Sequence, residues 1–167
     1  MCRNSVDWLY RLDESYTWSG APRIDSDRFF FDRKGHLRLV VGADGRITVT
    51  AGYAWNGCSP KVCLFDILVG TPDGVVHDVT CRPKTYFASM VHDALYQFLQ
   101  ADLPYTRRQA DEIFLRMMAE SDFAPRYVYW IAVRVLGGIM RFMISAKRGH
   151  DGQGVAAHAF LDERQFA

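Results

Sequence analysis

The chain has 167 residues, of which 49% are hydrophobic and 23% charged, and its formal net charge at pH 7 is +1. This length suits one domain with a sizeable core, and the composition is typical of globular proteins and excludes an intrinsically disordered chain. The near-neutral charge argues against nucleic acid as the main partner, because proteins that bind a phosphate backbone usually carry a clear basic excess.

The cysteines and the first residues of the chain predict its compartment. The first ten residues contain charges and no apolar segment, so we expect no secretory signal. None of the cysteines belongs to a CxxC pair, which argues against a structural zinc site. We therefore expect reduced thiols in a cytoplasmic protein; carriage in a phage particle or delivery by a secretion machine would also need no signal. The cysteines are Cys2, Cys58, Cys63 and Cys81.

The first half of the chain predicts antiparallel strands. Runs of β-branched and aromatic residues at 28–32, 37–41 and 47–50 are separated by turns at 34–35 and 43–46. Short strands broken by Gly and Asp turns are typical of a β meander. We expect strands roughly over 28–83. Within this region the stretch 51–60, rich in small and turn-forming residues, should form an ordered loop.

After Pro83 the spacing of apolar residues changes to that of helices. One helix is expected before the break at 101–105, and a second begins after Thr106, a suitable N-cap residue, so that the two form an antiparallel hairpin over 85–118. A third helix is expected from Tyr127 to about Ser145. The sequence therefore predicts one α+β domain over 1–145, with an antiparallel β meander followed by a three-helix unit, and a polar tail over 146–167.

No transmembrane helix is expected. The most apolar segment, 128–144, is shorter than the about 20 residues that span a bilayer, and it contains Arg134 and Arg141. The two arginines are seven residues apart and so share a helix face, with apolar residues opposite. This pattern is compatible with peripheral contact with an anionic membrane, and also with a core helix that has a solvated basic edge.

The candidate site lies in the helical hairpin. His92 and Tyr96 are four residues apart and share a face of the first helix, whereas Asp93 points about 100° away. Asp111 lies at the margin of the apolar stripe of the second helix. Arg108, three residues before Asp111 and on the same side, is expected together with Tyr96 to support the pair. Packing the two stripes together would bring His92 and Asp111 to the same edge of the seam.

Such a pair has a definite chemistry. A buried carboxylate fixes the tautomer of a histidine, stabilises its protonated form and leaves the other ring nitrogen as a general base for water. Asp93 could hold a calcium ion together with carbonyl oxygens of Trp55, Asn56 and Gly57, since calcium accepts backbone oxygens readily. The same residue types also suit a hydrogen-bonded polar seam that sets the register of the helices and does no chemistry.

Four segments resemble a family of phage and bacterial proteins defined by a domain of unknown function, number thirteen fifty-three. That family commonly has Asp at the position of Asn56, and the exchange would remove one anionic ligand if the loop binds metal. The family name carries no activity. The segments are 52–60 (GYAWNGCSP), 88–96 (ASMVHDALY), 108–114 (RQADEIF) and 129–138 (YWIAVRVLGG).

A second, local resemblance links 92–96 (HDALY) and 111–114 (DEIF) to phospholipases A-two. It implies that His92 is the base, that Asp93 binds calcium and that Tyr96 steadies Asp111. The resemblance also implies that the loop 55–58 supplies carbonyl ligands. The chain departs from those enzymes in having no disulfide framework and a β-rich first half.

These patterns lead to a hydrolase with a His92–Asp111 dyad, calcium-assisted or not, acting on a lipid or other ester. A noncatalytic phage or host-interaction protein with a structural polar seam is the alternative from another class. A divalent-metal phosphohydrolase, built on His77, Asp78 and the hairpin residues, is a further one. Cys58, Cys63 and Ser59 are weaker candidates for a nucleophile, because they lack the surroundings that activate one.

Overall fold

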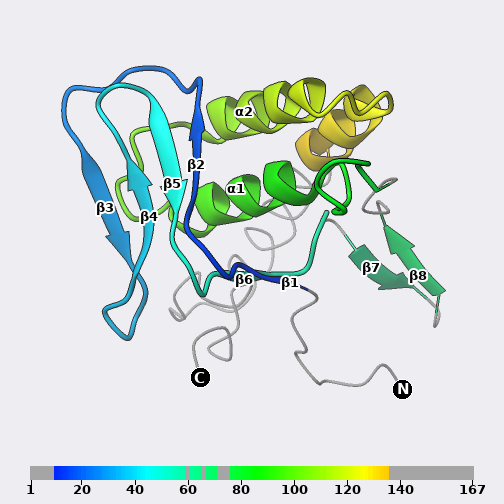
Figure 1. Ribbon diagram of the computed structural model, residues 1–167, viewed down its shortest axis with the longest axis horizontal. Helices are drawn as coiled ribbons and strands as arrows, with labels where there is room; N and C mark the ends of the chain where they lie inside the picture. The colour runs from blue at the N-terminus through cyan, green and yellow to red at the C-terminus, as the bar shows by residue number, and fades with distance from the viewer. Residues whose placement is uncertain (1–9, 59–60, 65–66, 71–75, 136–167) are drawn as a thin grey trace, which may run out of the picture.

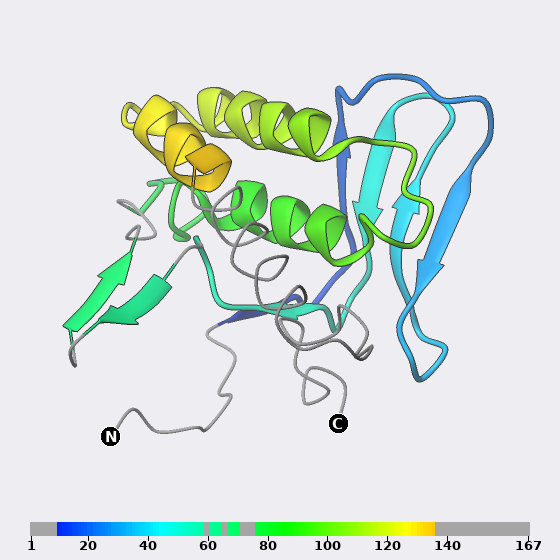
Figure 2. The same ribbon diagram turned by 180° about the vertical axis from the view of Figure 1, so that it is seen from behind.

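The computed structural model describes residues 10–58, 61–64, 67–70 and 76–135. In this part of the chain an antiparallel sheet stands beside a pair of helices, and both ribbon views show the helices on one side of the sheet (Figure 1, Figure 2). The predicted α+β class, with strands first and helices second, is confirmed.

The main sheet has four antiparallel strands in the order β2-β5-β4-β3. The three strands of the predicted meander are all present and adjacent. The fourth, β2, was not predicted, and it pairs with β5 on the far side, with Trp18 opposite Ile47. The strands are β2 (Tyr16–Ser19), β3 (Arg28–Phe31), β4 (Leu37–Val41) and β5 (Arg46–Val49).

Two short strand pairs lie outside this sheet. β1 (Tyr10–Arg11) pairs with β6 (Ala54–Trp55), so that the predicted loop 51–60 contains a short strand. β7 (Lys61–Leu64) pairs with β8 (Ile67–Gly70). The β1–β6 pair places the loop beside the first helix, which matters for the site described below.

The helices follow the predicted hairpin. α1 (Tyr86–Gln97) packs against α2 (Arg107–Glu120) and also contacts β4 and β5. Thr106 is the N-cap of α2, as predicted: its hydroxyl accepts from the backbone N–H of Gln109, while the Gln109 side chain accepts from the Thr106 N–H. Such a capping box is worth about 1 kcal/mol and pins the start of α2.

The core lies between the sheet and the hairpin. One side of each strand faces the helices, because side chains alternate along a strand, and four of these inward residues have no exposed surface. The apolar stripes of α1 and α2 close the core from the other side. The four strand residues are Leu39, Val41, Ile47 and Val49, and the helix residues without exposed surface include Met90, Val91, Leu95, Ala110 and Met118.

A third helical segment begins at residue 126, one residue before the predicted start, and is described to residue 135. The remainder of the predicted third helix and the predicted tail 146–167 lie outside the described residues. Within the described part of the chain, no helix has the length and apolar character needed to cross a membrane.

Candidate functional site

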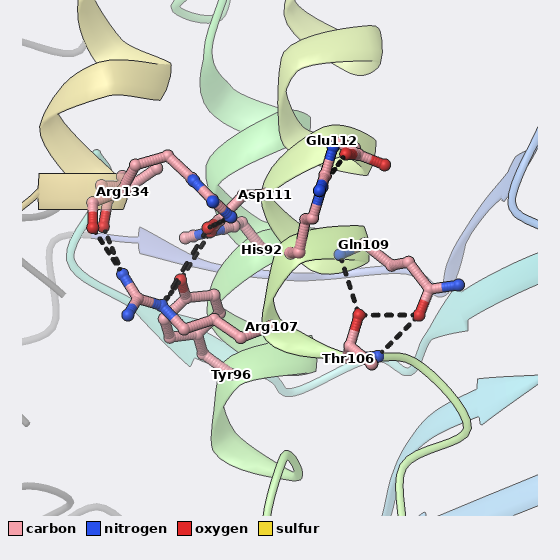
Figure 3. Close-up of polar contacts among 10 residues, drawn as sticks. His92, Tyr96, Thr106, Arg107, Gln109, Asp111, Glu112 and Arg134 are labelled. Carbon is pink, nitrogen blue, oxygen red and sulfur yellow. Dashed lines mark hydrogen bonds and ion pairs between the residues drawn. The ribbon is translucent and has the colours of Figure 1, made fainter. Parts of the chain in front are cut away.

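The hairpin brings His92 and Tyr96 of α1 against Asp111 of α2 (Figure 3). His92 Nε2 lies 3.0 Å from Asp111 Oδ1, and the Tyr96 hydroxyl donates to the same oxygen at 2.5 Å. The imidazole is also packed between two rings, those of Tyr96 and Phe114, with centroid distances of 4.2 and 4.7 Å. His92, Tyr96 and Asp111 therefore meet, as predicted. The spacing of four residues places His92 and Tyr96 on the same face of α1, so that both can reach Asp111.

Asp111 is held as a carboxylate in a sealed position. Its side chain has 0% exposure, and that of His92 has 7%. Burial by itself would raise the pKa of Asp111, but the hydrogen bonds from His92 and Tyr96 and the charge of Arg107 outweigh burial and lower this pKa below its usual value. Burial, together with the hydrogen bond to Asp111, raises the pKa of the Tyr96 hydroxyl, so Tyr96 is a donor and not a phenolate.

The arginine beside Asp111 is Arg107, and the expectation for Arg108 is wrong. Arg107 Nε donates to the Tyr96 hydroxyl at 2.9 Å and lies 4.0 Å from Asp111 Oδ2. The Arg108 side chain is 76% exposed and pairs with Glu112 at 2.9 Å. Positions i−3 and i−4 lie on either side of Asp111 on a helix, and the side on which α1 packs decides which one faces the seam.

A second arginine, Arg134, reaches Asp111 from the third helical segment. Its Nη1 lies 3.4 Å from Asp111 Oδ2, and its guanidinium lies over the Trp130 ring at 5.7 Å from the centroid. Arg107 Nη2 also donates to the carbonyl oxygens of Val133 and Arg134, both at 2.9 Å. Arg134 is therefore part of the network around the buried Asp111 carboxylate and not only an edge residue, and this carboxylate joins three helices. Arg141 lies outside the described residues.

The sequence singled out Arg134 only because it recurs with Arg141 at a spacing of seven residues, and this spacing did not predict a contact with Asp111. Arg107 gave no separate signal either, because it stands next to an equally plausible arginine. A contact across 23 residues, such as that between Arg134 and Asp111, depends on the packing of the third helix and not on any local pattern.

The other face of α1 meets the loop that contains β6. Ser89, one turn before Asp93, accepts a hydrogen bond from Trp55 Nε1 at 3.2 Å. Burial raises the pKa of Tyr53, and the negative charge of Asp93 raises it further. Asp93 therefore lies on the side of α1 that faces the loop, about a quarter turn from His92, as its position in the helix predicted.

The calcium expectation rests on one carboxylate, that of Asp93, together with oxygens of the loop 55–57. Among the described residues, no group of three or more His, Cys, Asp or Glu side chains is placed to hold a metal ion. Calcium takes six to eight oxygens, usually from several carboxylates, whereas the loop offers the amide of Asn56 and the carbonyls of Trp55 and Gly57. The same finding leaves the metal phosphohydrolase hypothesis without a donor cluster in this part of the chain.

The other candidates occupy separate places. His77 lies in a turn, where its Nδ1 accepts from the backbone N–H of Val79 at 3.2 Å. Cys58 is 1% exposed and packs in the core. Ser59 and the side chain of Cys63 lie outside the described residues. A pocket of about 180 Å³ is lined by residues at the start of α1 and the end of α2, including Lys84, Phe87 and Glu120, and not by His92 or Asp111.

Comparison with known proteins identifies one relationship. A family model described as "Protein of unknown function (DUF1353)" matches residues 42–133, a segment that includes the loop at β6 and both helices of the hairpin. No curated protein and no solved structure matches the chain.

Proposed function

The chain belongs to the DUF1353 family of proteins of unknown function, and we propose, from the geometry of its own residues, that it is a hydrolase in which His92 is the general base. One observation carries the proposal: His92 Nε2 is bound to a buried carboxylate, that of Asp111, at 3.0 Å. A carboxylate accepts, so a neutral His92 carries its proton on Nε2 and has its lone pair on Nδ1.

The surrounding residues support the orientation of this imidazole. Tyr96 donates to Asp111, and Arg107 donates to Tyr96, so that the carboxylate cannot rotate away from His92. A positioned base of this kind typically accelerates a reaction by about 10²–10⁴. Asp111 would also stabilise the positive charge that His92 acquires when it takes a proton.

The proposed reaction is the hydrolysis of an ester by water. Nδ1 of His92 accepts a proton from a water molecule while the oxygen of that water forms a bond to the ester carbonyl carbon. The bond from that carbon to the alkoxy oxygen then breaks, and the proton on Nδ1 passes to this oxygen, which leaves a carboxylic acid and an alcohol. No step of this reaction passes through calcium.

We assign a lipid as the leading substrate class. The resemblance of 92–96 and 111–114 to phospholipases A-two points to a lipid ester. The third helical segment adds a local argument: three apolar side chains at helical spacing remain more than half exposed, Val128 at 65%, Ile131 at 53% and Val135 at 52%. An exposed apolar stripe of this kind suits contact with the surface of a membrane.

A structural role is the second candidate, and the burial of the pair favours it. A base must reach its substrate, yet Asp111 has no exposed surface and His92 only 7%. Arg107 and Arg134 also lie near the Asp111 carboxylate, and their positive charges weaken its stabilisation of a protonated imidazole. In this candidate the network joins three helices and the chain acts by binding another protein.

The test compares His92→Gln with His77→Gln, which removes a histidine that belongs to a turn and is not part of the His92–Asp111 network. Both purified variants and the wild type are assayed on short-chain nitrophenyl esters and on phosphatidylcholine vesicles, with and without EDTA. We expect hydrolysis by the wild type that EDTA leaves unchanged, a loss of about 10²–10⁴ in kcat for His92→Gln and wild-type rates for His77→Gln.

If His92→Gln is poorly folded, Tyr96→Phe provides a milder variant. It keeps the ring against His92 and removes the hydroxyl that holds Asp111, so it should lower kcat with little change in KM. Wild-type protein without turnover on every ester would refute the proposal and leave the structural role. Equal rates for the wild type and a folded His92→Gln variant would refute His92 as the base.

A further inference from the structure

A pocket separate from the His92–Asp111 network lies between the start of α1, the end of α2 and β2. It has a volume of about 180 Å³, and neither His92 nor Asp111 lines it. At about 30 Å³ for each molecule of liquid water, this volume suits a ligand of roughly six to ten non-hydrogen atoms. Pockets for drug-sized ligands are larger, about 300–1,000 Å³. The pocket is therefore sized for a small molecule.

The buried part of the pocket lining is apolar. Ala88 of α1 and Met117 of α2 are 2% and 5% exposed. Beside them, the rings of Tyr16 and Phe87 stack on each other, with centroids 4.2 Å apart and an angle of 13° between their planes. Pro83 also belongs to this lining. These side chains suit a hydrocarbon group of the ligand, because contact with them removes its apolar surface from water.

Two side chains of opposite charge line the same pocket, Lys84 just before α1 and Glu120 at the last position of α2. Lys84 Nζ donates to the carbonyl oxygen of Asp122 at 3.0 Å, and an ammonium has further N–H donors that can bind a ligand. Glu120 accepts from Trp18 Nε1 at 2.7 Å through Oε2, and the other oxygen of a carboxylate can accept as well. Both groups can therefore bind a ligand without losing these partners.

The two charges restrict the chemistry of the ligand. A ligand with only a negative charge would be repelled by Glu120, and one with only a positive charge by Lys84. A zwitterion can place its anionic group beside Lys84 and its cationic group beside Glu120. Burial raises the pKa of Tyr16, and the charge of Glu120 raises it further, so the carboxylate lies close to the aromatic part of the lining. Charged and apolar parts of one small ligand can thus be bound together.

We propose that this pocket binds a free α-amino acid with a short apolar side chain. Lys84 binds its carboxylate, Glu120 binds its ammonium group, and the apolar lining contacts its side chain. Charge-assisted hydrogen bonds at both ends give the stronger part of the recognition. A residue within a peptide has neither charge, so the pocket selects the free amino acid. The site is separate from His92, and the proposal does not depend on hydrolysis by the protein.

Titration of the isotope-labelled full chain with L-leucine, followed by proton–nitrogen NMR, tests the proposal. The indole N–H of Trp18 is the reporter, because it donates to Glu120, and its signal is assigned by its loss in Trp18→Phe. With about nine non-hydrogen atoms, L-leucine should shift this signal with a Kd of about 1 mM or below. Isocaproate lacks the ammonium group and isoamylamine lacks the carboxylate, so each should bind at least about fivefold more weakly than L-leucine.

Two variants assign the charges to the two ends of the ligand. Glu120→Gln keeps an acceptor for Trp18 and removes the charge, so it should weaken L-leucine at least about fivefold in Kd and should not weaken isocaproate. Lys84→Gln should weaken both ligands. Glu112→Gln is the matched control, since it removes the same charge from α2 at a side chain outside the pocket, and it should bind L-leucine as the wild type does.

Several results would overturn the proposal. One is a wild type whose Trp18 signal does not move with L-leucine up to about 20 mM. Others are isocaproate or isoamylamine binding as tightly as L-leucine, and Glu112→Gln weakening L-leucine as much as Glu120→Gln does. If either pocket variant fails to fold, the comparison of the three ligands on the wild type decides, because it requires no substitution.

Discussion

Replacing Asp111 by Asn should destabilise the protein by about 3 kcal/mol. Oδ1 of Asp111 accepts from His92 and Tyr96, and Oδ2 lies 3.4 Å from Arg134 and 4.0 Å from Arg107. The amide of Asn keeps one oxygen, which can accept from His92 and Tyr96. Its NH2 group would then stand at the position of Oδ2 and face the guanidinium groups of Arg134 and Arg107, which donate hydrogen bonds and cannot accept them. A hydrogen bond to a charged group contributes about 1.5–3 kcal/mol, and breaking a buried ion pair costs about 3–5 kcal/mol.

Urea unfolding of Asp111→Asn, followed by tryptophan fluorescence, measures this loss. For a chain of this size about 3 kcal/mol corresponds to a fall in Tm of about 6–12 °C. The matched control is Glu112→Gln, at the next position of the same helix, where the side chain is 49% exposed and pairs with exposed Arg108. Such an exposed helix pair contributes about 0.3–0.5 kcal/mol, so the control should unfold nearly as the wild type does.

The pH dependence follows from the lowered pKa of Asp111. A carboxyl whose pKa is lower in the folded than in the unfolded chain stabilises the fold above its ordinary value, near 4, and this contribution disappears as the pH falls through the folded-state pKa. The difference between wild type and Asp111→Asn should therefore be constant at neutral pH and shrink below about pH 4. A loss below about 1 kcal/mol at neutral pH, or a gap that widens in acid, would refute the buried network.

Two further predictions concern stability. Arg107→Ala should lower the free energy of unfolding by about 2–3 kcal/mol, because it removes donors to Tyr96 and to two carbonyl groups of the third helical segment. Arg108→Ala should lower it by less than about 0.5 kcal/mol. Chemical denaturation measures both losses, and equal losses would contradict the assignment of Arg107 as the arginine beside Asp111. Asp32→Asn should cost about 1–3 kcal/mol at pH 7. Burial opposes the ionisation of Asp32, but hydrogen bonds from His36, Arg38 and the Lys34 N–H lower its pKa to about 2. The stability that ionised Asp32 contributes to the wild type should therefore vanish as the pH falls from about 4 towards 2. An Asp32→Asn variant whose Tm falls in acid as much as that of the wild type would contradict this prediction.

Local patterns predicted most of the architecture. The alternation in 28–50 and its Gly turns predicted three strands of the meander; at one of these turns Gly45 has a φ of 85°, and a Cβ there would lie 2.3 Å from the Ala21 carbonyl oxygen. β2 was missed because its four residues stand apart from that meander and join it only through pairing with β5. A run of four residues with one buried position, Trp18, and one partly buried position, Tyr16, is too short to be distinguished from a loop by its pattern.

For the candidate site, the sequence by itself determined which side chains share a helix face. The spacing of His92 and Tyr96, the offset of Asp93 and the N-cap at Thr106 all follow from 3.6 residues per turn, and each is present in the structure. Tertiary structure alone decided that Arg107 and not Arg108 turns towards Asp111, and that Arg134 completes the network. The physical reason is that helical periodicity defines directions around one axis, whereas the rotation of one helix against its neighbours depends on how all their side chains pack together.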